Sequence, residues 1–323
     1  MRRILTVLIT MMVSLACLFG CGTNKTAGSD PGLRIVVTIF PEYDWVMNVL
    51  GENPSGADVT LLLDKGTDLH SFQPGAEDIM KIADCDLFIY VGGESDEWAE
   101  DALKESRNPD LTVLNLMDIL GENAKEEEEV EGMEAEEEEA DEEETEYDEH
   151  VWLSLKNAET FVQEIADAIS AKDPENEAVY QANAKEYTAK LAALDEEYSQ
   201  MVKDAKYSTL VFGDRFPFRY LTDDYDLSYY AAFKGCSAET EASFETILFL
   251  AKKLDELKLP CIMTIDSSNQ KIAKTVIENS ASKDQTILTL NSMQGVTAED
   301  VKQGETYLGI MEDNLAVLKE ALN

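Results

Sequence analysis

The chain contains only two histidines, and each lies in a short cluster of polar residues that could bind a metal ion. His70 lies in the sequence DLHSFQP (68–74), and His150 lies in DEHVWLS (148–154). Neutral imidazole is the commonest side-chain ligand for zinc and related ions. A single histidine is more often an ordinary hydrogen-bonding residue, so the importance of these two depends on the elements that position them.

The N-terminus has the layout of a bacterial export signal. Two arginines precede an apolar stretch from Ile4 to about Leu18, which is too short for a comfortable membrane span. The sequence LFGC (18–21) resembles the cleavage box of lipoproteins, in which Cys21 would be lipidated. A plain secreted protein is the alternative. We expect a signal peptide over residues 1–20 and a flexible tether over residues 21–32.

Charge and cysteine content limit the partners. A formal net charge of −40 argues against nucleic acid as a partner and against membrane contact other than through the lipid anchor. Divalent cations are favoured instead. Cys85, Cys236 and Cys261 remain after the export signal, and they show no CxxC spacing. We therefore expect neither a disulfide framework nor a thiolate metal site, but thiols buried in the core, at least one of them unpaired.

Eight candidate strands occur in two groups of four, each a short aliphatic or β-branched run bounded by Gly, Pro or Asp. They cover residues 33–40, 59–63, 87–91 and 111–116, then 209–212, 227–233, 261–265 and 286–290. The amphipathic segments that accompany them cover residues 43–50, 76–85, 97–105, 218–222, 243–257, 271–279 and 297–322. This alternation predicts an α/β fold of two (β/α)₄ lobes with mainly parallel sheets.

One long helix is predicted between the two groups. From about Pro174 to Ala205, apolar residues recur every three or four positions without an interior Gly or Pro. About thirty residues at 1.5 Å rise would span about 45 Å, the length of both lobes. A coiled coil would need more heptads. We expect an N-terminal lobe over 33–173, a linking helix over 174–205 and a C-terminal lobe over 206–323.

An acidic run precedes His150. Most residues from Glu126 to Glu149 are Asp or Glu, so this segment cannot bury enough apolar surface to fold alone. We expect a disordered loop over residues 122–147. It is either a solvated, self-repelling insertion or a weak cation trap beside His150. Deleting residues 126–146 should slow metal capture and leave equilibrium affinity almost unchanged.

Polar residues follow the predicted strands at the end where ligands gather in α/β sheets. His70 follows the second strand, and Asp214, Asp266 and Asn291 follow strands of the second group. Two imidazoles, including that of His150, and one or two oxygen donors from the second lobe would complete a metal site in the cleft. An Asp after a strand also commonly caps a helix or forms a turn.

The chain resembles the metal-specific, lipoprotein solute-binding proteins of bacterial ABC transporters, which include zinc and manganese receptors. The resemblance covers nearly everything after the signal peptide. It rests on the segments FPEYD (40–44), DLHSFQP (68–74), DLFIY (86–90), HVWLS (150–154), FRYL (218–221) and YLGIM (307–311). It implies two (β/α)₄ lobes bridged by one long helix, with the ion between them. Where many zinc members carry a histidine-rich loop, this chain is acidic.

The resemblance also implies a set of ligands, with His70 and His150 as the first two. The family's third ligand falls on Arg215, whose guanidinium has no free lone pair. Asp214 is then the expected substitute, Asn291 occupies the position of the fourth ligand and Asp266 could complete the site. Arg215 would neutralise surplus carboxylate charge beside the ligands.

The sequence thus predicts a monomeric, lipid-anchored receptor, not an enzyme, that binds a divalent metal outside the cytoplasmic membrane and delivers it to an ABC permease. Zn²⁺ is the expected cargo, and Mn²⁺ is the alternative because the same donors suit both ions. A metallohydrolase would need a general base such as that of HExxH, which is missing from the sequence. A calcium-dependent adhesin would need Asp-x-Asp loops, which are also missing.

Overall fold

The structure of the chain, a computed structural model, describes residues 32–134, 146–237 and 241–323. The predicted signal peptide and lipidation site at Cys21 therefore lie outside the described residues. Within the described part of the chain, no helix is both long and apolar enough to cross a membrane.

The N-terminal lobe is built on a four-stranded parallel sheet with the order β2-β1-β3-β4. Its strands are β1 (Arg34–Val37), β2 (Asp58–Leu61), β3 (Leu87–Tyr90) and β4 (Thr112–Asn115). Its helices are α2 (Phe40–Leu50), α3 (Ala76–Asp84), α4 (Trp98–Lys104), α5 (Leu116–Leu120) and α6 (Leu155–Lys172). Every residue of β3 is buried, as the continuous apolar run predicts for a central parallel strand.

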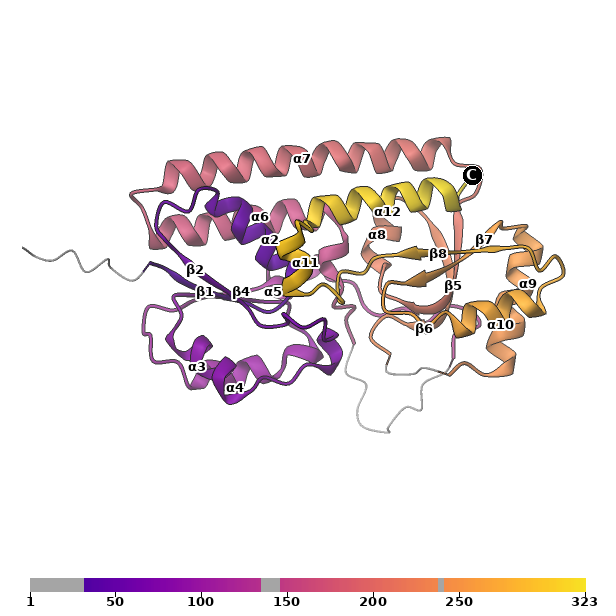
Figure 1. Cartoon of the computed structure of the whole chain (residues 1–323), viewed down its shortest axis with the longest axis horizontal. Helices are drawn as coiled ribbons and strands as arrows, with labels where there is room; N and C mark the ends of the chain where they lie inside the picture. Colours follow the sequence, from indigo (N-terminus) through magenta and orange to yellow (C-terminus); the bar gives the residue numbers. More distant parts are fainter. Residues whose placement is uncertain (1–31, 135–145, 238–240) are drawn as a thin grey trace, which may run out of the picture. The chain divides into compact units, whose positions relative to one another are not determined.

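The C-terminal lobe repeats this arrangement, with a parallel sheet in the order β6-β5-β7-β8 (Figure 1). Its strands are β5 (Thr209–Phe216), β6 (Ser228–Lys234), β7 (Cys261–Ile265) and β8 (Thr286–Leu290). Its helices are α8 (Arg219–Asp224), α9 (Phe244–Leu257), α10 (Lys271–Asn279), α11 (Ala298–Gln303) and α12 (Tyr307–Ala321). The predicted fold class, two lobes with four-stranded parallel sheets, is confirmed.

Several predicted element boundaries are wrong, and two of the differences have a clear structural reason. The strand predicted to end at Phe212 continues to Phe216, because the pairing of β5 with β6 tolerates a register shift between Phe212 and Arg215. The final helix predicted over 297–322 is two helices, α11 and α12. Gly304 ends α11 with φ +99°, a left-handed conformation that glycine adopts readily.

The predicted linking helix is α7 (Glu177–Asp204), which runs along both lobes (Figure 1). Near its start it packs on α2, where the Tyr187 hydroxyl donates to Asp44 Oδ2 at 3.0 Å. Near its end it packs on α12, where the Tyr198 hydroxyl donates to the Met311 carbonyl at 2.6 Å. Helix α6, which was not predicted, packs extensively against α7.

Short 3₁₀ turns occur in the connections of the N-terminal lobe. They are η1 (Leu69–Ser71), η2 (Glu94–Asp96), η3 (Gly121–Asn123) and η4 (Val151–Leu153). The turn η4 is tied to the C-terminal lobe, because Trp152 Nε1 donates to the Ser292 carbonyl at 2.9 Å. The Tyr307 hydroxyl donates to the Trp152 carbonyl at 2.7 Å. The position of His150, next to η4, thus depends on both lobes.

The acidic segment is not a disordered loop at its two ends, contrary to the prediction for residues 122–147. Its described residues pair with each other, since Glu127 N donates to the Glu146 carbonyl at 2.9 Å. They also contact the C-terminal lobe, where Arg219 pairs with Glu128 and Glu134 N donates to the Ala232 carbonyl at 2.9 Å. Basic side chains of this lobe neutralise part of the negative charge of the acidic segment. Residues 135–145 lie outside the described residues.

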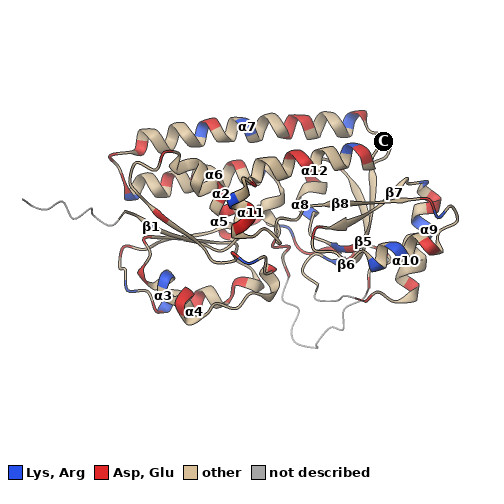
Figure 2. Ribbon diagram, in the orientation of Figure 1, with Lys and Arg blue, Asp and Glu red and all other residues tan. Residues whose placement is uncertain are grey.

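Acidic side chains are spread over the helices of both lobes, with lysines interspersed on α7, α9 and α10 (Figure 2). The acidic residues are therefore not restricted to the acidic segment. Such a surface favours cations over anionic macromolecules as partners.

Candidate metal-binding site

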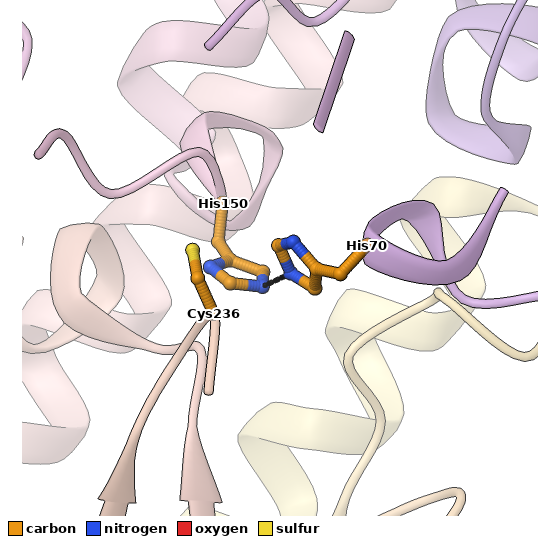
Figure 3. A group of neighbouring side chains, drawn as sticks. All are labelled: His70, His150 and Cys236. Atoms are coloured by element: carbon orange, nitrogen blue, oxygen red, sulfur yellow. Dashed lines mark hydrogen bonds between the residues drawn. The ribbon is translucent and has the colours of Figure 1, made fainter. Parts of the chain in front are cut away.

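The two histidines that were predicted as ligands lie side by side, with their rings tilted by 59°. His70 belongs to η1, and its backbone N–H donates to Asp68 Oδ1 at 3.1 Å. His150 directly precedes η4, and its backbone N–H donates to Asp148 Oδ1 at 2.8 Å. The Nε2 atoms of the two rings are 3.2 Å apart (Figure 3). Two distant segments of the N-terminal lobe thus meet at one point.

A carboxylate orients each ring through its other nitrogen. His70 Nδ1 lies 3.2 Å from Glu149 Oε2 and 2.7 Å from Ser95 Oγ. His150 Nδ1 lies 2.9 Å from Asp148 Oδ1. An ionised carboxylate only accepts hydrogen bonds, so Nδ1 of His150 carries a proton and Nε2 of the neutral ring presents its lone pair. Carboxylates that hold imidazoles in this way are typical partners of metal-ligating histidines.

The electrostatics favour a positive charge between the rings. Burial lowers the pKa of His150, but the adjacent Asp148 carboxylate raises it, and the net pKa is above its ordinary value. Burial raises the pKa of Glu149, but hydrogen bonds from His70 and Ser95 bring it below its ordinary value, so this carboxylate is ionised. Two lone pairs 3.2 Å apart repel unless a proton or a metal ion lies between them.

Cys236, which the sequence analysis wrongly expected in the core, lies beside the two histidines and could donate a third ligand atom. Its side chain is partly exposed, whereas Cys85 and Cys261 are buried, and all three thiols are unpaired. The sulfur lies within 4.8 Å of one nitrogen of each imidazole, and these ligand atoms form the one such group of His, Cys, Asp and Glu in the described part of the chain (Figure 3). Its place just after β6, at the carboxyl end of a strand, was the signal that could have identified it.

An acidic hollow of about 270 Å³ opens beside these donors. It is lined by His70, Glu94, Ser95, Glu127, Glu146, Tyr147, Glu149 and Cys236. Burial and neighbouring carboxylates raise the pKa of Glu94 above its ordinary value, which shows how closely the negative charges crowd here. A concave surface of one sign raises the local concentration of oppositely charged ions.

Arg215 serves as an ion-pair partner between the two lobes. Its Nη2 donates to Asp68 Oδ2 at 2.7 Å and thereby connects the C-terminal lobe to the turn of His70. Burial raises the pKa of Asp68, but Arg215 lowers it, and the net pKa is below its ordinary value. The Gln294 amide donates to Asp68 Oδ1 at 2.8 Å, and its oxygen lies 3.2 Å from His150 Nε2. Gln294 was not predicted from the sequence.

Asp214 lies near the histidines but outside their donor group. It lines a second hollow, of about 410 Å³, together with Asp68 and His70. Its Oδ1 accepts a hydrogen bond from Arg215 N at 3.0 Å. Burial raises the pKa of Asp214 above its ordinary value.

The two remaining predicted ligands support the loop that contacts η4. Asp266 follows β7 and Asn291 follows β8, as predicted. Asp266 Oδ1 accepts hydrogen bonds from Ser292 N at 2.7 Å and from Ser292 Oγ at 2.8 Å. Asn291 Oδ1 accepts one from Met293 N at 2.8 Å. These contacts position the carbonyl of Ser292, to which Trp152 donates.

Comparisons with known proteins identify relatives of this chain. The chain is 32% identical, over 311 residues, to the zinc-binding lipoprotein AdcA of Streptococcus pneumoniae (strain TIGR4), covering 96% of this chain and 60% of AdcA. It thus spans about 60% of the length of that relative. It is 30% identical to the high-affinity zinc uptake system protein ZnuA of Bacillus subtilis, covering 97% of each protein.

Solved structures show the same fold. The Zn(II)-bound ZnuA-like domain of AdcA from Streptococcus pneumoniae matches with a TM-score of 0.68 and 28% identity, over 90% of this chain and 99% of that domain. The metal-dependent lipoprotein YcdH from Bacillus subtilis matches with a TM-score of 0.72 and 27% identity, over 90% and 100%. The family model of the periplasmic component A of the zinc-uptake complex matches residues 35–321. The chain therefore belongs to this family of metal-specific substrate-binding proteins of ABC transporters.

Proposed function

We propose that the protein is an extracytoplasmic receptor that captures Zn²⁺ and delivers it to the permease of an ABC transporter. The bound ion lies between His70 and His150. The receptor is a monomer and catalyses no reaction, since capture and release of an ion require no bond to be formed or broken in a substrate.

The single observation that carries this proposal is the 3.2 Å separation of the two Nε2 atoms. With Zn–N bonds of about 2.0–2.1 Å and tetrahedral angles, two imidazole ligands of one zinc ion are separated by about 3.3 Å. The rings are therefore spaced and oriented for the ion before it binds. Asp148 and Glu149 hold this arrangement, which reduces the reorganisation that binding requires.

The identity of the cargo is supported by the relatives. AdcA and ZnuA are named for zinc binding and zinc uptake, and the AdcA domain was solved with Zn(II). The acidic hollow beside His70 supports the interpretation of the acidic segment as a cation-attracting element, since Glu127 and Glu146 belong to that segment and line the hollow.

The place of action follows from the same relatives and from the export signal. We propose that a lipid at Cys21 holds the protein on the outer face of the cytoplasmic membrane, as expected for a relative of a lipoprotein. The small and polar residues that follow Cys21 in the sequence would link the lipid to the receptor. Cys21→Ala should release the protein from the membrane fraction without changing its zinc affinity.

The test is a zinc competition titration with a chromophoric chelator. His70→Ala and His150→Ala should each weaken zinc binding by orders of magnitude, because each removes one of the ligands that face the ion. Gln163→Ala on the exposed face of α6 is the control and should bind zinc like the unmodified chain. Unchanged zinc affinity in the double histidine variant would show that the ion binds elsewhere and would refute the proposal.

A further inference from the structure

Cys236 differs from the other described cysteines in its surroundings. Cys85 and Cys261 are buried, and the Cys261 thiol lies against Met263 and the Ala321 carbonyl. Cys236 lies just after β6 and lines the acidic hollow together with His70. A thiol that only fills the core has no need of a polar, solvent-connected position beside two imidazoles.

The backbone around Cys236 is held toward His150. Cys236 N donates to Glu127 Oε1 at 3.0 Å, which anchors the residue from the acidic segment. At Gly235, a Cβ atom would lie 3.0 Å from His150 Cε1 and 3.0 Å from the Phe216 carbonyl oxygen. Glycine thus permits an approach of this loop to the imidazole that a side chain would obstruct.

Besides Cys236, the C-terminal lobe places a cationic side chain, that of Arg215, near the histidines. The Arg215 guanidinium is engaged with Asp68 at 2.7 Å and cannot bind a metal ion. Asp214 and Asp266 are not part of the donor group, whereas Cys236 is. In a tetrahedral zinc site a thiolate and an imidazole nitrogen are separated by about 3.6 Å. One nitrogen of each imidazole and the Cys236 sulfur lie within 4.8 Å of one another, so an approach of about 1 Å would bring the sulfur to the separation of a zinc ligand.

We propose that Cys236 is the ligand that the C-terminal lobe contributes, so that the ion is held by two imidazoles and one thiolate. This inference rests on the proposed function and deepens it. Thiolate is a soft ligand that favours zinc and other borderline or soft metals, whereas Mn²⁺ and Ca²⁺ prefer oxygen donors. Cys236 therefore makes the receptor selective for zinc over manganese, the alternative cargo, and links the two lobes through the ion.

The experiment uses Co²⁺ as a spectroscopic probe in the full chain. The cobalt-loaded protein should show an intense sulfur-to-cobalt charge-transfer band in the near ultraviolet. Cys236→Ser should lose this band and keep the weaker visible bands of histidine-bound cobalt. Cys261→Ser, which removes a buried thiol of the same lobe, is the matched control and should keep both.

Selectivity is measured on the same variants by competition between Zn²⁺ and Mn²⁺. Cys236→Ser should lower zinc affinity at least about tenfold and lower manganese affinity less, because even partners outside the coordination shell are worth about that much. Zn²⁺ should also protect Cys236 of the unmodified chain from alkylation, which mass spectrometry detects without any variant. Bound cobalt without the charge-transfer band, or alkylation that zinc does not slow, would overturn the inference and leave the receptor function standing. A chain that binds neither ion would overturn both.

Discussion

The guanidinium of Arg215 donates to the carboxylate of Asp68 at 2.7 Å, from β5 of the C-terminal lobe to the cap of the turn that carries His70. The contact holds the first ligand turn against the second lobe. Asp68 also accepts hydrogen bonds from the His70 backbone and the Gln294 amide, so one carboxylate gathers groups from both sides of the site. Arg215 cannot bind a metal ion itself, but its contact with Asp68 holds the two sides of the site together.

We predict that Arg215→Gln speeds zinc release. Both partners are about one-fifth exposed, so the loss should be about 1 kcal/mol, or roughly a fivefold increase in the dissociation rate. Stopped-flow transfer of zinc to a chelator measures this rate. Arg34→Gln, which breaks an ion pair with Asp86 inside the N-terminal lobe, is the control and should leave the rate unchanged. Equal rates in both variants would show that the contact does not hold the site closed.

The carboxylates behind the imidazoles should matter nearly as much as the ligands. Asp148→Asn and Glu149→Gln each remove a charge that orients an Nδ1–H and supports a bound cation. Each should lower zinc affinity about 10- to 100-fold in a competition titration. Asp101→Asn, an exposed residue of α4, provides the control. Affinity unchanged by both substitutions would mean that the rings are oriented by packing alone.

The structure changes what we expect from deleting residues 126–146. The sequence predicted an almost unchanged equilibrium affinity, but Glu127 accepts the hydrogen bond from Cys236 N at 3.0 Å. The deletion should therefore weaken zinc binding as well as slow capture. Glu127→Ala should reproduce the weakening, whereas Glu127→Gln keeps an accepting oxygen and should restore most of the affinity. If the deletion slows capture and leaves affinity intact, the segment acts only as a cation trap.

Folding stability should fall as pH rises, because of a buried carboxyl near the start of α2. Burial raises the pKa of Glu42 from 4.5 to about 8, although Thr38 N donates to its Oε2 at 2.8 Å. The folded state therefore binds a proton that the unfolded chain releases above pH 4.5. The stability tied to this proton is fully present below pH 4.5 and is lost as the pH rises through about 8.

Glu42→Gln should flatten this decline, since the amide stays neutral and can still accept from Thr38. Urea unfolding of the metal-free chain at several pH values measures the slope. Part of the slope should remain, because burial also raises the pKa of Asp96 to about 7. Glu77→Gln, at an exposed position of α3, should not alter it. A wild-type stability that rises over this interval would contradict the prediction.

The sequence by itself determined the fold class and directed attention to two histidines as candidate ligands. Apolar runs such as Leu87–Tyr90 and Cys261–Ile265 mark central parallel strands, because strands buried on both faces exclude polar residues. The period of three or four residues likewise identified α7, whose apolar face is covered along its length. The scarcity of histidine directed attention to His70 and His150, since few other side chains in the chain could serve as neutral nitrogen ligands.

Only the tertiary structure decided what surrounds the histidines. Cys236 has no spacing motif, and its relation to His150 depends on the end of β6, on Gly235 and on a contact from the acidic segment. From the sequence, Arg215 was expected at a ligand position although it cannot bind a metal. In the structure it pairs with Asp68, which lies far away in the sequence. Local patterns encode strands and helices because their periods repeat within a few residues. A binding site is assembled from loops at the ends of separate strands and helices. The packing of the two lobes determines which side chains meet there.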